Sequence, residues 1–195
     1  NGALPTGPNQ HVQPGADEIL YQGEAVSYKE YEYFMLNKPK GCVSAVTDAQ
    51  HQTVLDLLDT KNRKDLFPVG RLDRDTEGLL IITNDGKLCH NLLAPGKHVP
   101  KTYFARVSGN VTTEDIAQFA RGMDIGEEKD TLPAKLQLLS NDGTFSEIML
   151  TITEGKFHQV KRMFQAVGKE VLYLKRISMG SLKLDDSLQP GEYRQ

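Results

Sequence analysis

Residues 70–80 read Gly-Arg-Leu-Asp-Arg-Asp-Thr-Glu-Gly-Leu-Leu, a polar loop that runs directly into an apolar segment. The apolar, β-rich run continues through residues 79–83 and ends at the turn signal Asn84-Asp85-Gly86, which predicts a short buried strand. Glycines bracket the polar loop at both ends. Loops held at the edge of a rigid sheet commonly carry binding and catalytic residues. We therefore expect a functional loop that ends where this strand begins.

Asp73 is the residue of this loop best suited to chemistry. Arg71 and Arg74 lie close to it in the sequence, and a nearby arginine favours the ionised form of a carboxyl group. An ionised aspartate can act as a nucleophile, a base or an electrostatic stabiliser. The alternative is a solvated or structural cluster of salt bridges, which is the commoner role of a loop rich in Arg and Asp.

Strands, helices and hairpins are interleaved along the rest of the chain. β-rich segments predict strands at residues 33–37, 101–108, 135–139, 148–153 and 171–177. Helical spacing and capping residues predict helices at residues 53–59, 112–122 and 157–167. The turn Asn141-Asp142-Gly143 should join two of the strands in a hairpin. This order indicates an α+β fold with a mixed, largely antiparallel sheet, flanking helices and a central active-site cleft.

The predicted helix at residues 157–167 has one apolar and one basic side. Phe157, Val160, Phe164 and Val167 recur at helical spacing and should bury one side. Cations occupy the other side and its flanks: Lys156, His158, Lys161, Arg162, Lys169, Lys175 and Arg176. Such a face can lay positive charge along a phosphate backbone, in which case affinity for RNA falls steeply with salt. The alternative is a solvated basic face.

We expect the basic helix and the loop of Asp73 to face one cleft. The acidic stretch at residues 124–130 should lie away from the wall of that cleft that contacts phosphate, because like charges would repel. Lys101-Thr102-Tyr103 places an aromatic ring at the start of a strand, where Tyr103 can stack on a base taken out of its helix. An isolated tyrosine more often fills core or surface.

Composition narrows the class of protein. The 195 residues carry a formal net charge of -3 at pH 7, which argues against a protein that coats nucleic acid indiscriminately. Cys42 and Cys89 form no CxxC or Cys/His cluster, and the histidines lack metal-ligand spacing, so we expect neither disulfides nor a metal. Phosphate-binding glycine motifs of nucleotide cofactors are missing. Without a secretory signal or an apolar run near the ~20 residues of a membrane helix, we expect a cytoplasmic protein without membrane attachment.

Three segments together resemble the active-site segments of the ribosomal pseudouridine synthases of the small-subunit type. They are GRLDRDTEGLL at 70–80, KTY at 101–103 and EGKFHQVKRMF at 154–164, in matching order and spacing. YFMLNKPKG at 33–41 and pieces near 117–130 and the C-terminus extend the resemblance from about residue 30 to the end. It implies that Asp73 is the essential aspartate, Tyr103 packs against a flipped uracil, and Lys161 is the basic partner of the aspartate, with Arg71 beside them.

The resemblance also implies the reaction and its partners. The bond between ribose and the ring nitrogen of uridine breaks, the uracil turns, and it rejoins through a ring carbon, without a cofactor. Asp73 would attack the sugar carbon, add to the uracil ring, or abstract a ribose proton, and the sequence does not choose among these. Tyr103 would stack and remove the ring-carbon proton. The implied partner is ribosomal RNA or the assembling small subunit, and we expect a monomer.

Residues 1–26 resemble the later part of the small RNA-binding module, first described in a ribosomal protein, that precedes this catalytic domain in the family. Its opening helices are missing. We expect residues 27–32 to be a linker and residues 33–195 to be the catalytic domain.

Three other readings stay open. A noncatalytic RNA-binding assembly factor would use the basic helix and keep Asp73 for structure. The closely similar large-subunit synthases share the three segments. A glycoside hydrolase would need two acids flanking the scissile bond, for which Asp75 and Glu77 are candidates.

Overall fold

The computed structural model describes residues 4, 7, 9–13, 16–25, 29–59 and 65–195, in two units, Asn1–Glu32 and Tyr33–Gln195. The first unit contains a small antiparallel hairpin of β1 (Leu20–Tyr21) and β2 (Glu24–Ala25). Its turn residues Gln22 and Gly23 have φ values of 53° and 86°, and two-residue type I′ turns require positive φ at both positions. That residues 1–26 belong to an RNA-binding module stays a prediction, and residues 27 and 28 of the expected linker lie outside the described residues.

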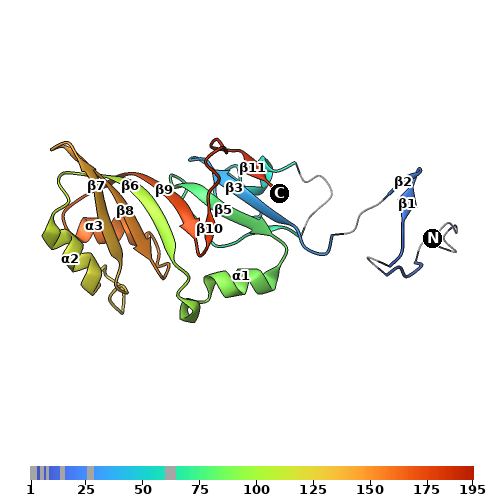
Figure 1. The fold of residues 1–195 in the computed structure, drawn as a ribbon, viewed down its shortest axis with the longest axis horizontal. Coiled ribbons are helices and arrows are strands. Elements are labelled where there is room, and N and C mark those ends of the chain that lie inside the picture. Colours follow the sequence, from blue (N-terminus) through green and yellow to red (C-terminus); the bar gives the residue numbers. More distant parts are fainter. Residues whose placement is uncertain (1–3, 5–6, 8, 14–15, 26–28, 60–64) are drawn as a thin grey trace. The chain divides into compact units, whose positions relative to one another are not determined.

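Within the described part of the second unit, a nine-stranded sheet forms the framework (Figure 1). Its order is β11-β3-β5-β9-β6-β8-β7, with β4 paired to β5 and β10 to β9. The strands are β3 (Tyr33–Lys38), β4 (Phe67–Pro68), β5 (Glu77–Thr83), β6 (Lys101–Ser108), β7 (Lys135–Asn141), β8 (Phe145–Ile152), β9 (Val171–Met179), β10 (Leu182–Lys183) and β11 (Tyr193–Arg194). The β5–β9 pair is parallel, and the other described pairs of the sheet are antiparallel. The predicted α+β class with a mixed, largely antiparallel sheet is confirmed.

β5 is buried on both faces, which explains its unbroken apolar run. Leu80 and Ile82 point into the main core. Leu79 and Ile81 point the other way, into a smaller cluster that includes Leu92 of α1 (Gly86–Leu93). The strand therefore needs cover from both sides, and α1 supplies one of them.

The segment after β5 differs from its prediction. Asn84-Asp85-Gly86 signals a turn, but Asp85 is the N-cap of α1, and its Oδ1 accepts a hydrogen bond from the Leu88 amide at 2.9 Å. The same residue types favour turns and helix N-caps, so a turn signal alone does not separate the two. A 3-10 turn, η2 (Pro95–Lys97), leads on to β6.

The predicted helix at residues 53–59 is reduced to a single 3-10 turn, η1 (Leu55–Leu57). Thr53 and Asp56 exchange capping hydrogen bonds of 2.8 and 3.3 Å, so the start signal is real, but the chain turns away after Leu58. In contrast, α2 (Thr113–Arg121) has the predicted capping box between Thr112 and Asp115 and ends at Gly122.

The basic helix α3 (Gln159–Ala166) begins two residues later than expected. Val160 and Phe164 are buried in the main core as predicted. The prediction for Phe157 is wrong, because this side chain precedes the helix and is 69% exposed. His158 has a φ of 48°, a left-handed conformation that a right-handed helix cannot include, so the helical spacing stops short of Phe157.

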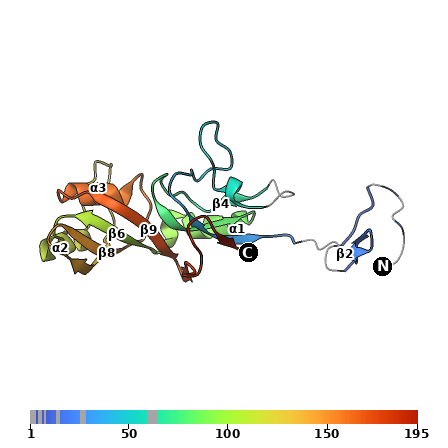
Figure 2. The same ribbon diagram turned by 90° about the horizontal axis from the view of Figure 1, so that it is seen from above.

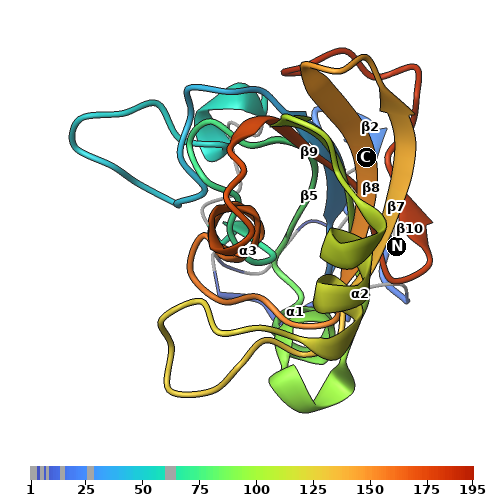
Figure 3. The same ribbon diagram turned by 90° about the vertical axis from the view of Figure 1, so that its left-hand side faces the viewer.

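α3 and the loop of residues 41–59 lie on the same side of the sheet (Figures 2 and 3). The segment before β5 also approaches this side, since Ser44 of the loop is bonded to Leu72. None of the helices in the described part of the chain is long and apolar enough to cross a membrane.

Candidate active site

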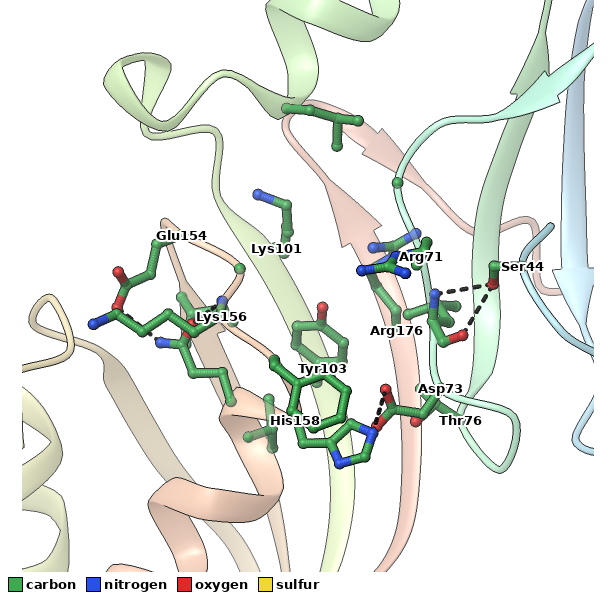
Figure 4. Close-up of a pocket in the computed structure, with 18 of the residues that line it drawn as sticks. Ser44, Arg71, Asp73, Thr76, Lys101, Tyr103, Glu154, Lys156, His158 and Arg176 are labelled. Atoms are coloured by element: carbon green, nitrogen blue, oxygen red, sulfur yellow. Dashed lines mark hydrogen bonds and ion pairs between the residues drawn. The ribbon is translucent and has the colours of Figure 1, made fainter. Parts of the chain in front are cut away.

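A cavity of about 730 Å³ opens beside the N-terminal end of β5. The loop at residues 70–74 forms one wall, and residues 152–161, which lead into α3, form another. Lys101 and Tyr103 of β6 and Arg176 of β9 belong to its lining (Figure 4). The predicted arrangement, in which the loop of Asp73 and the basic segment face one cleft, is therefore present.

The end of β3 holds the backbone of the Asp73 loop. Lys38 is fully buried, and its Nζ donates to the carbonyl oxygens of Thr76 at 2.8 Å, Pro39 at 3.0 Å and Arg74 at 3.4 Å. Burial lowers the pKa of the Lys38 ammonium below its ordinary value, although nearby acidic groups such as Cys42 oppose the shift. A buried ammonium bonded to two carbonyls that follow Asp73, those of Arg74 and Thr76, restrains the loop.

Two residues that follow β3 in the chain, Gly41 and Ser44, also form hydrogen bonds with the loop of Asp73. Ser44 Oγ donates to the Leu72 carbonyl and accepts from the Leu72 amide, both at 3.0 Å. The Gly41 amide donates to the Arg74 carbonyl at 2.7 Å, and Arg74 Nε donates back to the Gly41 carbonyl at 3.1 Å. The backbone is thus bonded on each side of Asp73.

Gly78 brings this loop against β9. Gly78 and Arg176 are register partners in the parallel pair, and Gly78 has a φ of +101°. A Cβ at position 78 would lie 2.2 Å from the Arg176 carbonyl oxygen. Only glycine permits this approach. Because Arg176 is also the register partner of Tyr103 in β6, three strands meet at the cavity.

Asp73 lies between two basic side chains from the start of α3. Its Oδ2 is 3.1 Å from Lys161 Nζ, and its Oδ1 is 3.4 Å from His158 Nε2. Lys161 Nζ also contacts Asp75 Oδ1 at 2.6 Å. Burial opposes the charge on Lys161, but hydrogen bonds to both aspartates outweigh it and raise the pKa of the ammonium. Asp73 is 26% exposed, so the carboxylate is both held and reachable.

The flanking arginines do not hold Asp73, contrary to the expectation from the sequence. Arg74 turns its Nε to the Gly41 carbonyl. Arg71 lines the cavity, but among the described residues the ion pairs of Asp73 are those with His158 and Lys161. Proximity along the chain was a poor guide because side chains of an irregular loop point in different directions.

Tyr103 lies on the floor of the cavity and is 7% exposed. Figure 4 shows it between Lys101 and the pair formed by Asp73 and His158. Lys101 and Tyr103 are two residues apart on β6 and therefore share one face of the strand. A buried ring beside a carboxylate can receive a planar ligand by stacking.

Two buried cations accompany Tyr103. Lys101 Nζ donates to the Val99 carbonyl at 3.1 Å, and Arg176 Nε donates to the Leu79 carbonyl at 2.8 Å. Arg176 Nη2 is buried and has no hydrogen-bond partner among the residues that the structure describes. Burial, and then the charge of Arg176, lower the pKa of Lys101. Within the described chain neither cation has a carboxylate partner, so the floor favours an anion.

The remaining predicted RNA-binding residues are not all at the cavity. Lys156 lines it, with its Nζ contacting the carbonyl oxygens of Lys129 and Asp130. Lys169 pairs with Asp115 of α2 at 2.8 Å, and neither it nor Lys175 belongs to the cavity lining. On β9, Lys175 alternates with Leu174 and Arg176, which do line the cavity.

No residue of the acidic stretch at 124–130 lines the cavity, as expected, but the stretch lies beside the basic segment. Arg162 Nη1 is 2.5 Å from Glu127 Oε1, and its Nη2 donates to the Ile125 carbonyl. Arg162 lowers the pKa of the Glu127 carboxyl, mainly through its hydrogen bond and to a lesser extent through its charge. Attraction between the two stretches decides their placement, and part of the basic charge is used inside the protein.

Lys38, Ser44 and Lys101 are parts of the site that were not predicted from the sequence. Lys101 had a usable signal, since alternation along a strand places it on the same face as Tyr103. For Lys38 and Ser44 no such signal exists, because their role depends on where the loop of Asp73 folds back. The described residues include no group of three or more His, Cys, Asp or Glu side chains that could hold a metal ion.

Comparison with known proteins gives consistent results. A family model for RNA pseudouridylate synthase matches residues 32–166. The chain is 51% identical over 187 residues to an uncharacterized RNA pseudouridine synthase, YtzG, of Bacillus subtilis, covering 95% of this chain and 78% of that protein. It is 42% identical over 179 residues to ribosomal small subunit pseudouridine synthase A of Escherichia coli K12, covering 91% and 76%.

Solved structures extend the comparison. A crystal structure of a pseudouridylate synthase superposes with a TM-score of 0.79 at 39% identity, covering 100% of this chain and 82% of the other. The archaeal box H/ACA Nop10-Cbf5 complex has a chain with a TM-score of 0.58 at 20% identity, covering 82% of this chain and 50% of that one. The second likeness concerns the fold alone.

Proposed function

The chain belongs to the RNA pseudouridylate synthase family, and from this premise we propose that it converts a specific uridine of small-subunit ribosomal RNA to pseudouridine through Asp73. The reaction breaks the bond between ribose and a ring nitrogen, turns the uracil, and joins the ribose to a ring carbon. Atoms are conserved, so the isomerisation consumes no second substrate.

The contact set of Asp73 carries the proposal. Lys161 at 3.1 Å and His158 at 3.4 Å stabilise a negative charge on this carboxylate, and its partial exposure leaves it open to a ligand in the cavity. A carboxylate held by a lysine ammonium and an imidazole is a preorganised group that can act on the ribose or on the uracil. His158, first assigned to RNA binding, takes a place beside the carboxylate in this proposal.

The position of Tyr103 supports a flipped-out uridine. Its ring is 7% exposed on the cavity floor, so a base within a helix does not reach it without leaving the stack. We assign Tyr103 to stacking on the uracil and to removal of the ring-carbon proton in the last step. Tyr103→Phe separates these roles, because the ring remains and the hydroxyl is lost. Full activity of this variant would refute the assignment to proton removal.

The buried cations of the floor suit the RNA backbone. Lys101 and Arg176 lack a carboxylate partner in the described chain, and a phosphate of the bound nucleotide would supply the opposite charge. Lys156 and Arg71 line the same cavity. We propose ribosomal RNA, free or in the assembling small subunit, as the partner of a cytoplasmic, monomeric protein.

The glycoside hydrolase alternative needs a second catalytic acid, and neither Asp75 nor Glu77 is placed to serve as one. Asp75 is engaged by Lys161, which holds the pKa of the Asp75 carboxyl below its ordinary value despite the opposing effect of burial. Glu77 accepts a hydrogen bond from the Tyr173 hydroxyl at 2.8 Å and does not line the main cavity. An inverting or retaining pair of carboxyl groups across one substrate is therefore not favoured.

The test is to incubate the protein with unmodified small-subunit ribosomal RNA and map pseudouridine by carbodiimide-dependent stops of reverse transcription. One new stop in small-subunit RNA, free or in partly assembled subunits, is the expected result. A stop confined to large-subunit RNA would contradict the substrate and keep the reaction. The absence of stops in free small-subunit RNA, in partly assembled subunits and in large-subunit RNA would contradict the proposed function.

A further inference from the structure

Phe157 stands out among the residues around Asp73. It is 69% exposed, yet it belongs to the lining of the cavity. Isolated apolar side chains on a surface need no explanation, but this one lies at the mouth of the candidate active site. Its exposure at this place therefore suggests a role in binding a ligand that enters the cavity.

The ring of Phe157 is fixed from one side. It stacks on the His158 ring with centroids 3.8 Å apart and planes inclined by 20°. Arg162 Nη1 donates to the Phe157 carbonyl at 3.1 Å and is itself paired with Glu127. Because His158 reaches Asp73 at 3.4 Å, the order from the carboxylate outwards is Asp73, His158, Phe157. The high exposure of Phe157 leaves its outer surface free for a ligand.

An RNA substrate needs such a surface. When a uridine leaves the stack, the neighbouring base loses a stacking partner, and aromatic side chains commonly replace it. Tyr103 is buried on the floor and takes one ring at most. Phe157 lies one ring beyond His158, at the rim, where the adjacent nucleotide must pass. Lys156 and Lys161, which also line the cavity, supply positive charge for the backbone around it.

We propose that Phe157 is the stacking surface for the nucleobase next to the isomerised uridine, with His158 supporting its inner face. This inference rests on the proposed function and adds a base contact to it. Stacking is tolerant of base identity, so Phe157 contributes affinity and placement of the strand rather than a choice between sequences.

The test compares Phe157→Ala and Phe157→Trp with the unmutated protein on an RNA that carries 2-aminopurine beside the target uridine. The unmutated protein and Phe157→Trp should quench the fluorescence on binding. Phe157→Ala should lose the quench and raise Kd and KM by roughly 5- to 150-fold, the range of base–aromatic stacking, with kcat nearly unchanged. Phe145→Ala is the matched control, since Phe145 is 38% exposed and does not line the cavity.

A role restricted to positioning His158 has a different signature. In that case Phe157→Ala would lower kcat, and it would have no further effect in a His158→Gln background. Stacking on RNA predicts that the loss of affinity persists in that background. Unchanged quenching and KM in Phe157→Ala, or an effect that disappears with His158→Gln, would overturn the inference while the unmutated protein still makes pseudouridine. Failure of the unmutated protein to make pseudouridine would instead refute the proposed function.

Discussion

Replacing Gly78 by alanine should both destabilise the protein and disable its site. The new Cβ would lie 2.2 Å from the Arg176 carbonyl oxygen and 2.8 Å from its amide nitrogen, at a φ of +101°. Relief of this overlap requires β5 and β9 to separate by about 1 Å, and overpacking of this kind costs about 1–3 kcal/mol. Backbone strain at positive φ adds about 1–3 kcal/mol.

The two effects together predict a loss of about 4 kcal/mol in the free energy of unfolding. For a domain of this size that corresponds to a decrease of roughly 8–16 °C in Tm, measured by circular dichroism. The same shift moves Thr76 and the loop of Asp73, which directly precede Gly78. A misplacement of about 1 Å costs on the order of 100-fold in rate, so pseudouridine formation per folded molecule should fall by that factor.

Two other glycines separate the contributions. Gly109→Ala has positive φ, +71°, and open space around the new atom, so it isolates the backbone strain. Gly122→Ala meets the Thr131 carbonyl at 2.2 Å with a φ of +85°, but it lies at the end of α2 and outside the cavity lining. It should lower Tm about as much and leave the rate per folded molecule intact. An unchanged Tm for Gly78→Ala, or an equal loss of rate in Gly122→Ala, would show that the close approach of Gly78 to Arg176 does not hold the site.

Three further variants test other parts of the protein. Lys38→Met removes the buried donor of the Pro39, Arg74 and Thr76 carbonyls and should lower the free energy of unfolding by about 2–4 kcal/mol in urea titrations. A loss below about 1 kcal/mol would show that these bonds are not needed to hold the loop. Burial opposes the charge of Asp115, but Lys169 and the capping amide hold the pKa of its carboxyl below the ordinary value, so its stabilisation is present above about pH 4 and is lost as pH falls through the lower folded value. Asp115→Asn should therefore be less stable at pH 7 and lose less stability than the unmutated protein on acidification, and parallel acid curves would contradict this. Lys101→Met removes a buried like charge beside Arg176, so it should raise Tm without RNA yet reduce the slope of log affinity against log salt by about 0.7, and an unchanged slope would exclude a phosphate contact.

The sheet could be predicted because buried positions recur along each strand as a regular pattern of apolar residues. β6 has the predicted bounds of residues 101–108, and the capping box of α2 is visible in Thr112 and Asp115. The apolar run of β5 could be recognised as a buried strand. It could not reveal that α1 covers one of its faces, because Asn84-Asp85-Gly86 is compatible with a turn and with a helix start.

Local sequence patterns do not predict structure where a single backbone angle, or a partner distant in the chain, determines where a side chain lies. Phe157 fits the helical spacing of α3, but the left-handed conformation of His158 puts it outside the helix. Arg162 lies on the basic side of that helix, but its charge is used by Glu127, 35 residues earlier in the chain. Formal charge in the sequence therefore overstates the charge that the protein can offer to RNA.

The candidate site likewise has residues that could be predicted from the sequence and residues that could not. The family resemblance predicted that Asp73, Tyr103 and Lys161 share one site, and the structure brings all three to one cavity. The clamp formed by Lys38 and Ser44 was invisible, since backbone carbonyls are its partners and every residue has one. Sequence patterns record side chains that differ from their surroundings, but they do not record which carbonyl a lysine meets.

The most direct test of the role of Asp73 compares Asp73→Asn with the unmutated protein in two assays on the same RNA, single-turnover pseudouridine formation and equilibrium binding. Asparagine keeps the shape of the side chain and removes the charge that Lys161 and His158 contact. If Asp73 is the catalytic carboxylate, conversion falls to background while RNA affinity stays close to that of the unmutated protein. Conversion at the unmutated rate would show that Asp73 is not the catalytic carboxylate.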